Sequence, residues 1–590
     1  MSRPRLAIAA LLVLALAVAL RFPALDVLLP SLVEPDAHIA VQVELIEKDD
    51  PHPGRTIDWG KYPLLVAWTT IALTPAPIWG SLDPAAPIEE HLALAAAPFV
   101  RVRWTVAFLS LLALPATWIL ARLYLPRGAA LTATWLAATS LLAVHFATQG
   151  RPHGAAVGFF GFALVSAVLV RRRGDVLAYG IASLACALCF GALQSGVAVY
   201  IALGVAHLLA GPLRSARHWK LLIPAAGFAL ALALLYPFWL FGEGAEGERV
   251  ALEQGRINQA GHLIIFRAFN GRGLGILARA LLSWDPLLAA ALVAGFALWL
   301  ADRARRRPGG LALRDHLVVL GFVVPYASVI SLYQRSYERF LLPLLPCLCV
   351  LAAWVLWRAL RAAAARGAPV RAAAVGAALV ALAFPAVPST CLLAARRAPS
   401  TFEVAAAWVA EHVDPATGSC ALSMPLILPL YRTPEALATE RLPRQRSRGF
   451  AWIYYQREAL GQARPDPAWN LRWMPLQRLE WRAWLLRWPR QFVYSLHGEW
   501  AIIEVFEEGR IDPAGRGLRD ALSAHAERVA RFSPDRDPQA FDAPLVYQDE
   551  TGGTVPWMAV RVLGARRMGP VLEVYRLPER PAESRGGDRR

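Results

Sequence analysis

The most constraining feature of the sequence is a repeated run of apolar residues, each long enough to cross a bilayer as one helix, which takes roughly 20 residues. Only 18% of the 590 residues are charged and the mean hydropathy is +0.40, as expected for a chain that lies largely in lipid. We therefore predict a mainly α-helical, polytopic membrane protein. Eleven spans are expected, at residues 6–22, 104–125, 129–148, 154–170, 177–193, 195–212, 220–241, 283–300, 316–333, 340–358 and 372–394.

The loops between these runs differ in charge, and the difference predicts an orientation. Arginine clusters fall on alternate loops, on the same side as Arg3 and Arg5, and cytoplasmic loops carry the excess of basic residues. The N-terminus is therefore predicted to lie in the cytoplasm of a bacterium, with the protein in the inner membrane. The apolar stretch 62–80 contains three prolines, and we interpret it as a short interfacial or re-entrant helix on the outer face.

The net charge of +17 does not indicate nucleic-acid binding. Before residue 395 the chain has 33 basic and 20 acidic residues, so most of the excess lies in the membrane part, where topology accounts for it. No nucleic-acid partner is expected. The six cysteines are too few and too scattered for a disulfide scaffold or a zinc module.

The composition changes abruptly near residue 395, which divides the chain into two parts. We expect a membrane domain over 1–394 with a first outer loop at 23–103, an extracytoplasmic, periplasmic α/β domain over 395–580, and a disordered tail at 581–590. The α/β domain is expected to open with a helix at 402–413 and to contain another near 515–532. Its predicted strands are 418–422, 450–455, 492–496, 500–506 and 570–576.

Eleven of the 20 acidic residues before position 395 lie in the first outer loop. Asp36 is distinctive because it follows a predicted span closely and stands in the sequence Glu34-Pro35-Asp36-Ala37-His38. A carboxylate at the membrane boundary can act on a substrate carried by a lipid. For any other single acid of this loop, a solvated surface position is the simpler interpretation.

Basic residues recur at the predicted outer ends of several helices. Lys61 precedes Tyr62-Pro63, Arg151 and His153 flank Pro152, and Arg335 and Arg339 lie within four residues of each other. Snorkelling toward lipid headgroups would explain any one of them. A set of such groups beside a carboxylate indicates that the outer face binds a lipid phosphate.

Four parts of the sequence share a family pattern: residues 34–38 (EPDAH) with 50–53 (DPHP) and 59–65 (WGKYPLL), residues 145–153 (HFATQGRPH), residues 337–346 (YERFLLPLLP) and residues 569–577 (GPVLEVYRL). They resemble the GT-C fold glycosyltransferases, and in particular the protein O-mannosyltransferases, the aminoarabinose transferase of lipid A and their bacterial relatives. The resemblance implies a GT-C membrane fold and a sugar donor carried on polyprenyl phosphate.

The resemblance also implies roles for single residues. Asp36 matches the aspartate that acts as base on the acceptor, Lys61 matches a lysine that meets the donor phosphate, and Arg339 matches the arginine of the late motif. Arg151 and His153 correspond by position more than by identity. The sequence departs from the family at Ala37, where relatives carry an acidic residue, so the role of that residue is either absent here or supplied by Glu34, His38 or another group.

The predicted function is therefore transfer of a sugar from a polyprenyl-phosphate donor to a hydroxyl of a lipid, glycan or protein, with inversion at the sugar carbon. Glu34, Asp36 and His38 could hold a divalent metal, but the cations already offset the phosphate charge and we expect no cofactor. Two other functions remain open. The chain could be a transporter or flippase, or a non-catalytic membrane protein whose outer domain binds glycans.

Overall fold

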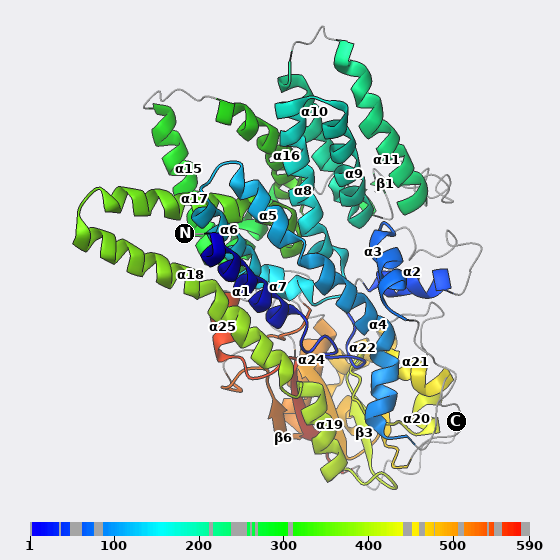
Figure 1. Cartoon of the computed structure of the whole chain (residues 1–590). Coiled ribbons are helices and arrows are strands. Elements are labelled where there is room, and N and C mark those ends of the chain that lie inside the picture. The colour runs from blue at the N-terminus through cyan, green and yellow to red at the C-terminus, as the bar shows by residue number, and fades with distance from the viewer. Residues whose placement is uncertain are drawn as a thin grey trace.

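The computed structural model describes residues 3–34, 37–47, 62–75, 86–211, 216–237, 256–259, 262–265, 269–304, 311–334, 336–439, 451–458, 466–476, 478–505, 513–539, 542–547 and 557–579. Helices dominate this part of the chain, and a small sheet lies with its own helices at one end of the bundle (Figure 1). The C-terminal part belongs to that end.

Seven continuous helical segments in the described residues are long and apolar enough to cross a membrane. Two bent helix pairs raise this number to nine if each pair is one span, and two shorter apolar helices lie at the two remaining positions. Apolar helical segments of the described residues thus coincide with all eleven predicted spans. The continuous segments contain α1 (Arg3–Arg21), α4 (Ile88–Ser110) with α5 (Ala113–Arg122), α8 (Pro152–Arg173), α11 (Leu222–Leu235), α16 (Leu311–Leu332), α17 (Leu345–Ala364) and α18 (Ala368–Arg397). The bent pairs are α6 (Arg127–Thr139) with α7 (Leu141–Ala147) and α14 (Arg272–Trp284) with α15 (Pro286–Ala304), and the shorter helices are α9 (Val176–Ala192) and η3 (Gln194–Ala198) with α10 (Val199–Leu209).

Short elements connect these helices. The predicted interfacial segment contains α3 (Leu65–Leu73), which has only nine residues. Helix α4 begins at Ile88, well before the span predicted from residue 104, so its N-terminal turns extend beyond the membrane part. The remaining connecting elements are α2 (His38–Glu47), α3 (Leu65–Leu73), η4 (Ala216–Leu221), the antiparallel pair β1 (Arg256–Gln259) and β2 (His262–Ile265), and η6 (Glu338–Leu344).

The bend between α6 and α7 exposes backbone groups that a continuous helix would pair internally. At the end of α6, Arg21 donates to the carbonyls of Ala137 and Ala138 at 3.2 and 2.9 Å. At the start of α7, Asp285 accepts from the Leu141 amide at 3.1 Å. A cation at a helix C-terminus and an anion at a helix N-terminus both match the helix dipole. The break is therefore stabilised by two buried charges from other helices.

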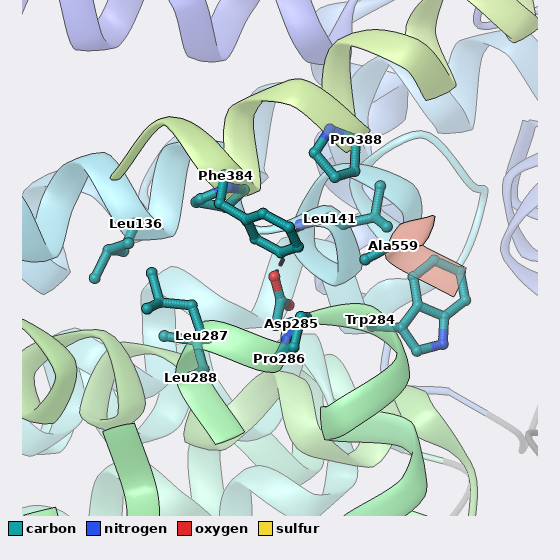
Figure 2. Close-up of a pocket in the computed structure, with 11 residues that line it drawn as sticks. Leu136, Leu141, Trp284, Asp285, Pro286, Leu287, Leu288, Phe384, Pro388 and Ala559 are labelled. Atoms are coloured by element: carbon teal, nitrogen blue, oxygen red, sulfur yellow. Dashed lines mark hydrogen bonds between the residues drawn. The ribbon is translucent and has the colours of Figure 1, made fainter. Parts of the chain in front are cut away.

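Asp285 also marks the sharp 119° bend between α14 and α15. Its carboxylate accepts a second hydrogen bond, at 2.7 Å, from Ser140, the N-cap residue of α7. Asp285 borders a small, otherwise apolar hollow whose other lining residues include Phe384 and Ala559 (Figure 2). One carboxylate thus joins two broken helices.

Helix α8 packs closely against its neighbours because glycines face them. A Cβ at Gly158 would lie 2.6 Å from Leu112, and one at Gly154 would lie 2.5 Å from the Phe146 carbonyl. Lipid is as apolar as the side chains, so helices in a membrane associate mainly through close packing, and small residues at their contacts let the backbones approach. At its other end, Arg172 donates to Asp315 of α16 at 2.6 Å.

The C-terminal part of the chain follows α18. Ser400 and Glu403 form a capping box, with the Ser400 amide donating to the Glu403 carboxylate at 2.6 Å, so a new helix starts there. The elements that follow are α19 (Thr401–His412), β3 (Ser419–Leu422), α20 (Pro434–Thr439), α21 (Ala451–Glu458), β4 (Asn470–Trp473), α22 (Leu479–Arg487), α23 (Pro489–Ser495), β5 (Trp500–Val505), α24 (Pro513–His525), β6 (Glu527–Phe532), α25 (Met558–Gly564) and β7 (Val571–Arg576).

The five strands β3 to β7 form one mixed sheet in the order β4-β3-β5-β7-β6. The pairs β4-β3 and β3-β5 are parallel, and the pairs β5-β7 and β7-β6 are antiparallel. Side chains alternate between faces, so Ile502 faces the core shared with α19 while Ala501 and Ile503 face α24. The α19 face belongs to the same apolar core as the membrane helices.

The predicted strands at 418–422, 500–506 and 570–576 correspond to β3, β5 and β7. The predictions at 450–455 and 492–496 are wrong, because these residues form α21 and α23. Trp452 and Tyr455 lie one helical turn apart and are both buried, so tertiary packing overrides their strand propensity. The helix predicted at 515–532 ends at His525, and its second half is the edge strand β6.

Glu504 on β5 provides a pH test of this packing. Burial raises the pKa of Glu504 to about 7, from an ordinary value of 4.5. Folding therefore favours the protonated acid, and stability decreases as the pH rises from about 4.5 to about 7. We expect Glu504→Gln to raise the midpoint of thermal unfolding by roughly 2–4 °C at pH 8 and to leave it unchanged at pH 4. Equal shifts at both pH values would contradict this.

Candidate active site

A buried ion pair lies where the first outer loop meets the membrane helices. Arg103 of α4 binds Glu34 with two parallel hydrogen bonds, from Nε at 2.9 Å and from Nη2 at 2.7 Å. The two side chains are 0% and 1% exposed. Burial alone would raise the pKa of Glu34, but the charge of Arg103 and the hydrogen bonds from Arg103 and Gly150 hold the pKa below its ordinary value. Glu34 is therefore a fixed negative charge.

The ion pair also receives groups from two distant parts of the chain. The Gly150 amide donates to Glu34, and a Cβ at residue 150 would lie only 3.1 Å from the same oxygen, so glycine suits this position. Arg103 donates to the Tyr547 hydroxyl, which itself donates to the Val27 carbonyl at 2.6 Å. The first outer loop, the start of α8 and the C-terminal domain thus meet at one point.

Further bonds fix the beginning of the first outer loop. Arg103 donates to the carbonyls of Leu25 and Val27 at 2.7 and 3.0 Å. Arg396, near the end of α18, donates to the Ala24 carbonyl at 2.9 Å. Irregular backbone near a membrane needs such internal partners. The path of residues 24–34 is therefore set by two arginines.

Aromatic contacts join the next parts of the site. Tyr62 has its ring 6.4 Å from the ring of His38 and 6.0 Å from that of His153. His153 in turn stacks on Phe340 at 6.2 Å, with an interplanar angle of 27°. These contacts connect α2, the residue after Lys61, the start of α8 and η6.

Two arginines accompany these rings. The Arg339 guanidinium lies 4.1 Å from the centre of the Tyr337 ring and 5.5 Å from that of Phe340. Arg151 is fully buried at the N-cap of α8, directly after the glycine that binds Glu34. Cation–π contact orients a guanidinium without neutralising it. Arg339 is thereby linked to His153 through the Phe340 ring, and the carboxylate of Glu338 is buried beside it in sequence.

The structure brings together His38, His153 and Arg339 of the sequence-predicted set, with Arg151 next to the Glu34 contact. Asp36 and Lys61, as well as Arg335, lie outside the described residues. Their neighbours are described: the Ala37 amide donates to the Glu34 carbonyl at 3.1 Å, and Tyr62 is buried. Glu34, expected as an auxiliary group, is bound on both sides by Arg103 and Gly150.

Sequence reasoning missed Arg103, Gly150 and Tyr547. Arg103 could have been noticed, because a charged residue in an apolar helix normally has a buried partner or a function. It lies, however, just outside the predicted span 104–125. No sequence feature indicated Tyr547, since its contact with Arg103 joins residues 444 positions apart.

The residues that could hold a metal are Glu34, Asp36 and His38. Within the ranges that the structure describes, three or more histidine, cysteine or acidic side chains do not gather closely enough to hold an ion. The Glu34 carboxylate is already paired with Arg103, which leaves it fewer lone pairs with which to bind a metal ion. Asp36, the other acid of the expected trio, lies outside those ranges.

No protein-family model matches the chain, and no curated protein matches it in sequence. Solved structures align with it over most of its length. ArnT from Cupriavidus metallidurans bound to undecaprenyl phosphate is 15% identical, and the alignment covers 96% of this chain and 97% of that one with a TM-score of 0.43. The aminoarabinose transferase, predicted as a resemblance, is thus among the aligned structures.

Two archaeal structures are also similar. The oligosaccharyltransferase AglB from Archaeoglobus fulgidus, in complex with an inhibitory peptide and a dolichol-phosphate, is 15% identical over 90% of this chain and 73% of that one, with a TM-score of 0.44. The complex of that organism's oligosaccharyltransferase with zinc and sulfate is 15% identical over 89% and 72%, with a TM-score of 0.41. These likenesses concern the path of the chain.

The ion pair predicts a loss of stability in a variant that lacks Arg103. Arg103→Ala leaves the Glu34 carboxylate buried without its countercharge, which costs about 3–5 kcal/mol. We expect a large fall in the thermal unfolding midpoint of the solubilised protein, followed by fluorescence. The double variant Glu34→Gln with Arg103→Met buries no charge at all and should recover much of the loss. A midpoint for Arg103→Ala equal to that of the native chain would contradict the pairing.

Proposed function

We propose that this membrane protein is a glycosyltransferase that moves a sugar from a polyprenyl-phosphate donor to an acceptor hydroxyl on the outer face of the membrane. The single observation that carries the proposal is the convergence of His38, Tyr62, His153 and Arg339 from four separate segments. In sequence, Lys61 directly precedes Tyr62, and Asp36 lies two residues before His38.

Asp36 is the proposed base that takes the proton of the acceptor hydroxyl. Glu34 is unsuited to that role, because its carboxylate is bound by Arg103 and Gly150 and its lowered pKa makes it a weak proton acceptor. Instead Glu34 anchors the chain two residues before Asp36. One carboxylate base suffices for a direct displacement, so we propose that the reaction inverts the sugar carbon.

The proposed phosphate site consists of Lys61, Arg151, His153 and Arg339. Arginine suits a phosphate because its guanidinium offers several donors in one plane. Arg339 lies over the faces of Tyr337 and Phe340, and such contacts orient a guanidinium. The departing phosphate would meet these cations as its negative charge develops.

The proposed orientation follows from the charged loops: N-terminus in the cytoplasm, C-terminal domain in the periplasm, and protein in a bacterial inner membrane. Tyr547 of that domain binds the same arginine as Glu34, which supports a site beside the domain. The acceptor class, whether lipid, glycan or protein, would then be selected where the domain adjoins the first outer loop.

Broken membrane helices are also used by transporters, which place substrates or ions at the free helix ends. Here the break at α6 and α7 is occupied by Arg21 and Asp285, together with Ser140. Because these side chains of the protein bind the described helix ends, the ends stabilise the fold and do not form a site for a transported ion. The arrangement therefore favours the enzyme over a transporter or flippase.

The base is tested by Asp36→Asn, with Asp26→Asn as the matched control because Asp26 is an exposed carboxylate of the same loop. In cells lacking the chain, we expect one surface glycan to disappear and the native gene to restore it. Asp36→Asn should reduce the restored transfer by about 100-fold or more. Asp26→Asn should restore it fully. Full transfer by Asp36→Asn at normal membrane levels would refute Asp36 as the base.

The phosphate site is tested by binding of undecaprenyl phosphate to the purified protein. Arg339→Gln removes a charged hydrogen-bond donor, and the Kd should rise about tenfold or more. Arg279→Gln changes an exposed arginine of α14 and provides the control. The proposed site would be wrong if both variants bound the lipid as tightly as the native chain.

A further inference from the structure

Helix α25 belongs to the C-terminal domain but packs against membrane helices. Its contacts are with α18 and α14, and Figure 1 shows it beside α18 at the edge of that domain. The Met558 amide donates to the Ser283 hydroxyl of α14 at 2.8 Å. Ala559 borders the hollow that Phe384 and Pro388 of α18 also line (Figure 2). One face of α25 therefore packs against membrane-spanning segments.

The same helix is tied firmly to its own domain. Arg561 donates to the Asp535 carboxylate at 3.2 Å and to the Pro544 carbonyl at 3.0 Å, and its side chain is 1% exposed. The position of α25 is thus fixed by the domain as well as by α14 and α18.

The opposite face of α25 is exposed and apolar. Trp557, Val560 and Leu563 are 48%, 54% and 39% exposed, and they are spaced three residues apart, so they form one stripe. Burial of such a stripe in an apolar surrounding is favourable, whereas contact with water is not.

The stripe continues the lipid-facing surface of the neighbouring spans. On α18, Phe384 and Val387 are 39% and 50% exposed, and on α14 Leu282 is 42% exposed. In a bilayer these side chains meet lipid, since α18 belongs to a candidate span of which only 6% of the apolar window is buried. The exposed stripe of α25 therefore adjoins a surface that lipid must cover.

We propose that α25 is an interfacial helix of the C-terminal domain, whose stripe of Trp557, Val560 and Leu563 inserts among the acyl chains of the adjacent leaflet. Two arginines follow within three residues of its end, Arg566 and Arg567, and Arg566 is exposed. A tryptophan at one end and basic residues at the other are typical of helices that lie in the headgroup region. The partner is the lipid bilayer, with phosphate headgroups beside the arginines. The proposal is independent of the reaction that the protein catalyses.

The test places a nitroxide spin label at position 560 of the full chain in lipid nanodiscs that hold one copy each. Accessibility to oxygen, which concentrates in lipid, is compared with accessibility to a water-soluble nickel complex. Val560→Cys is compared with Val380→Cys on α18, 71% exposed, and with Val529→Cys on β6, 40% exposed. The native chain, treated with the same label, corrects for its own cysteines.

We expect the oxygen-to-nickel ratio at position 560 to lie clearly above that at position 529, in the direction of the higher ratio at position 380, which is deeper in its span. A ratio like that at position 529 would show that the stripe faces water and would overturn the proposal. Low accessibility to both reagents would also overturn it, because the stripe would then lie against protein. A second measurement needs no label: lipids brominated on the acyl chain should quench the fluorescence of the native chain more than that of Trp557→Phe. Equal quenching of both would count against insertion.

Discussion

The buried pair of Glu34 and Arg103 is the interaction on which the end of the helix bundle nearest the C-terminal sheet depends. Two charges removed from water are tolerated only when their geometry is good and their remaining hydrogen-bonding groups are satisfied. Both conditions hold: the pair is bidentate, Gly150 completes the carboxylate, and Tyr547 with two loop carbonyls completes the guanidinium. The pair thereby fixes the first outer loop, the start of α8 and the C-terminal domain relative to one another.

The membrane part applies the same rule to its broken helices. A bend exposes backbone groups that lipid cannot satisfy, so each described break needs partners from elsewhere in the chain. Arg21 and Asp285 supply them between α6 and α7 with charges that match the helix dipoles. In this protein, buried charge serves to hold irregular backbone in place, both at this break and at residues 24–34.

The membrane helices could be predicted from sequence because lipid imposes length and hydropathy on each of them. The strands of the C-terminal domain were harder: residues 450–455 have strand propensity, but Trp452 and Tyr455 pack as one face of a helix beside α4. Of the site, the sequence indicated His38, His153 and Arg339 because they lie in short motifs. Glu34's partners could not be foreseen, since they depend on contacts as distant as that between Arg103 and Tyr547.

The central claim is that a lipid phosphate is bound beside His153 and Arg339 at the end of the bundle nearest the C-terminal domain. It is tested most directly by an electron cryo-microscopy structure of the full chain in a nanodisc with undecaprenyl phosphate. The account predicts the phosphate within about 3 Å of donors from Arg339 or Arg151. A phosphate bound at the opposite end of the bundle, near Arg172 and Asp315, would contradict it.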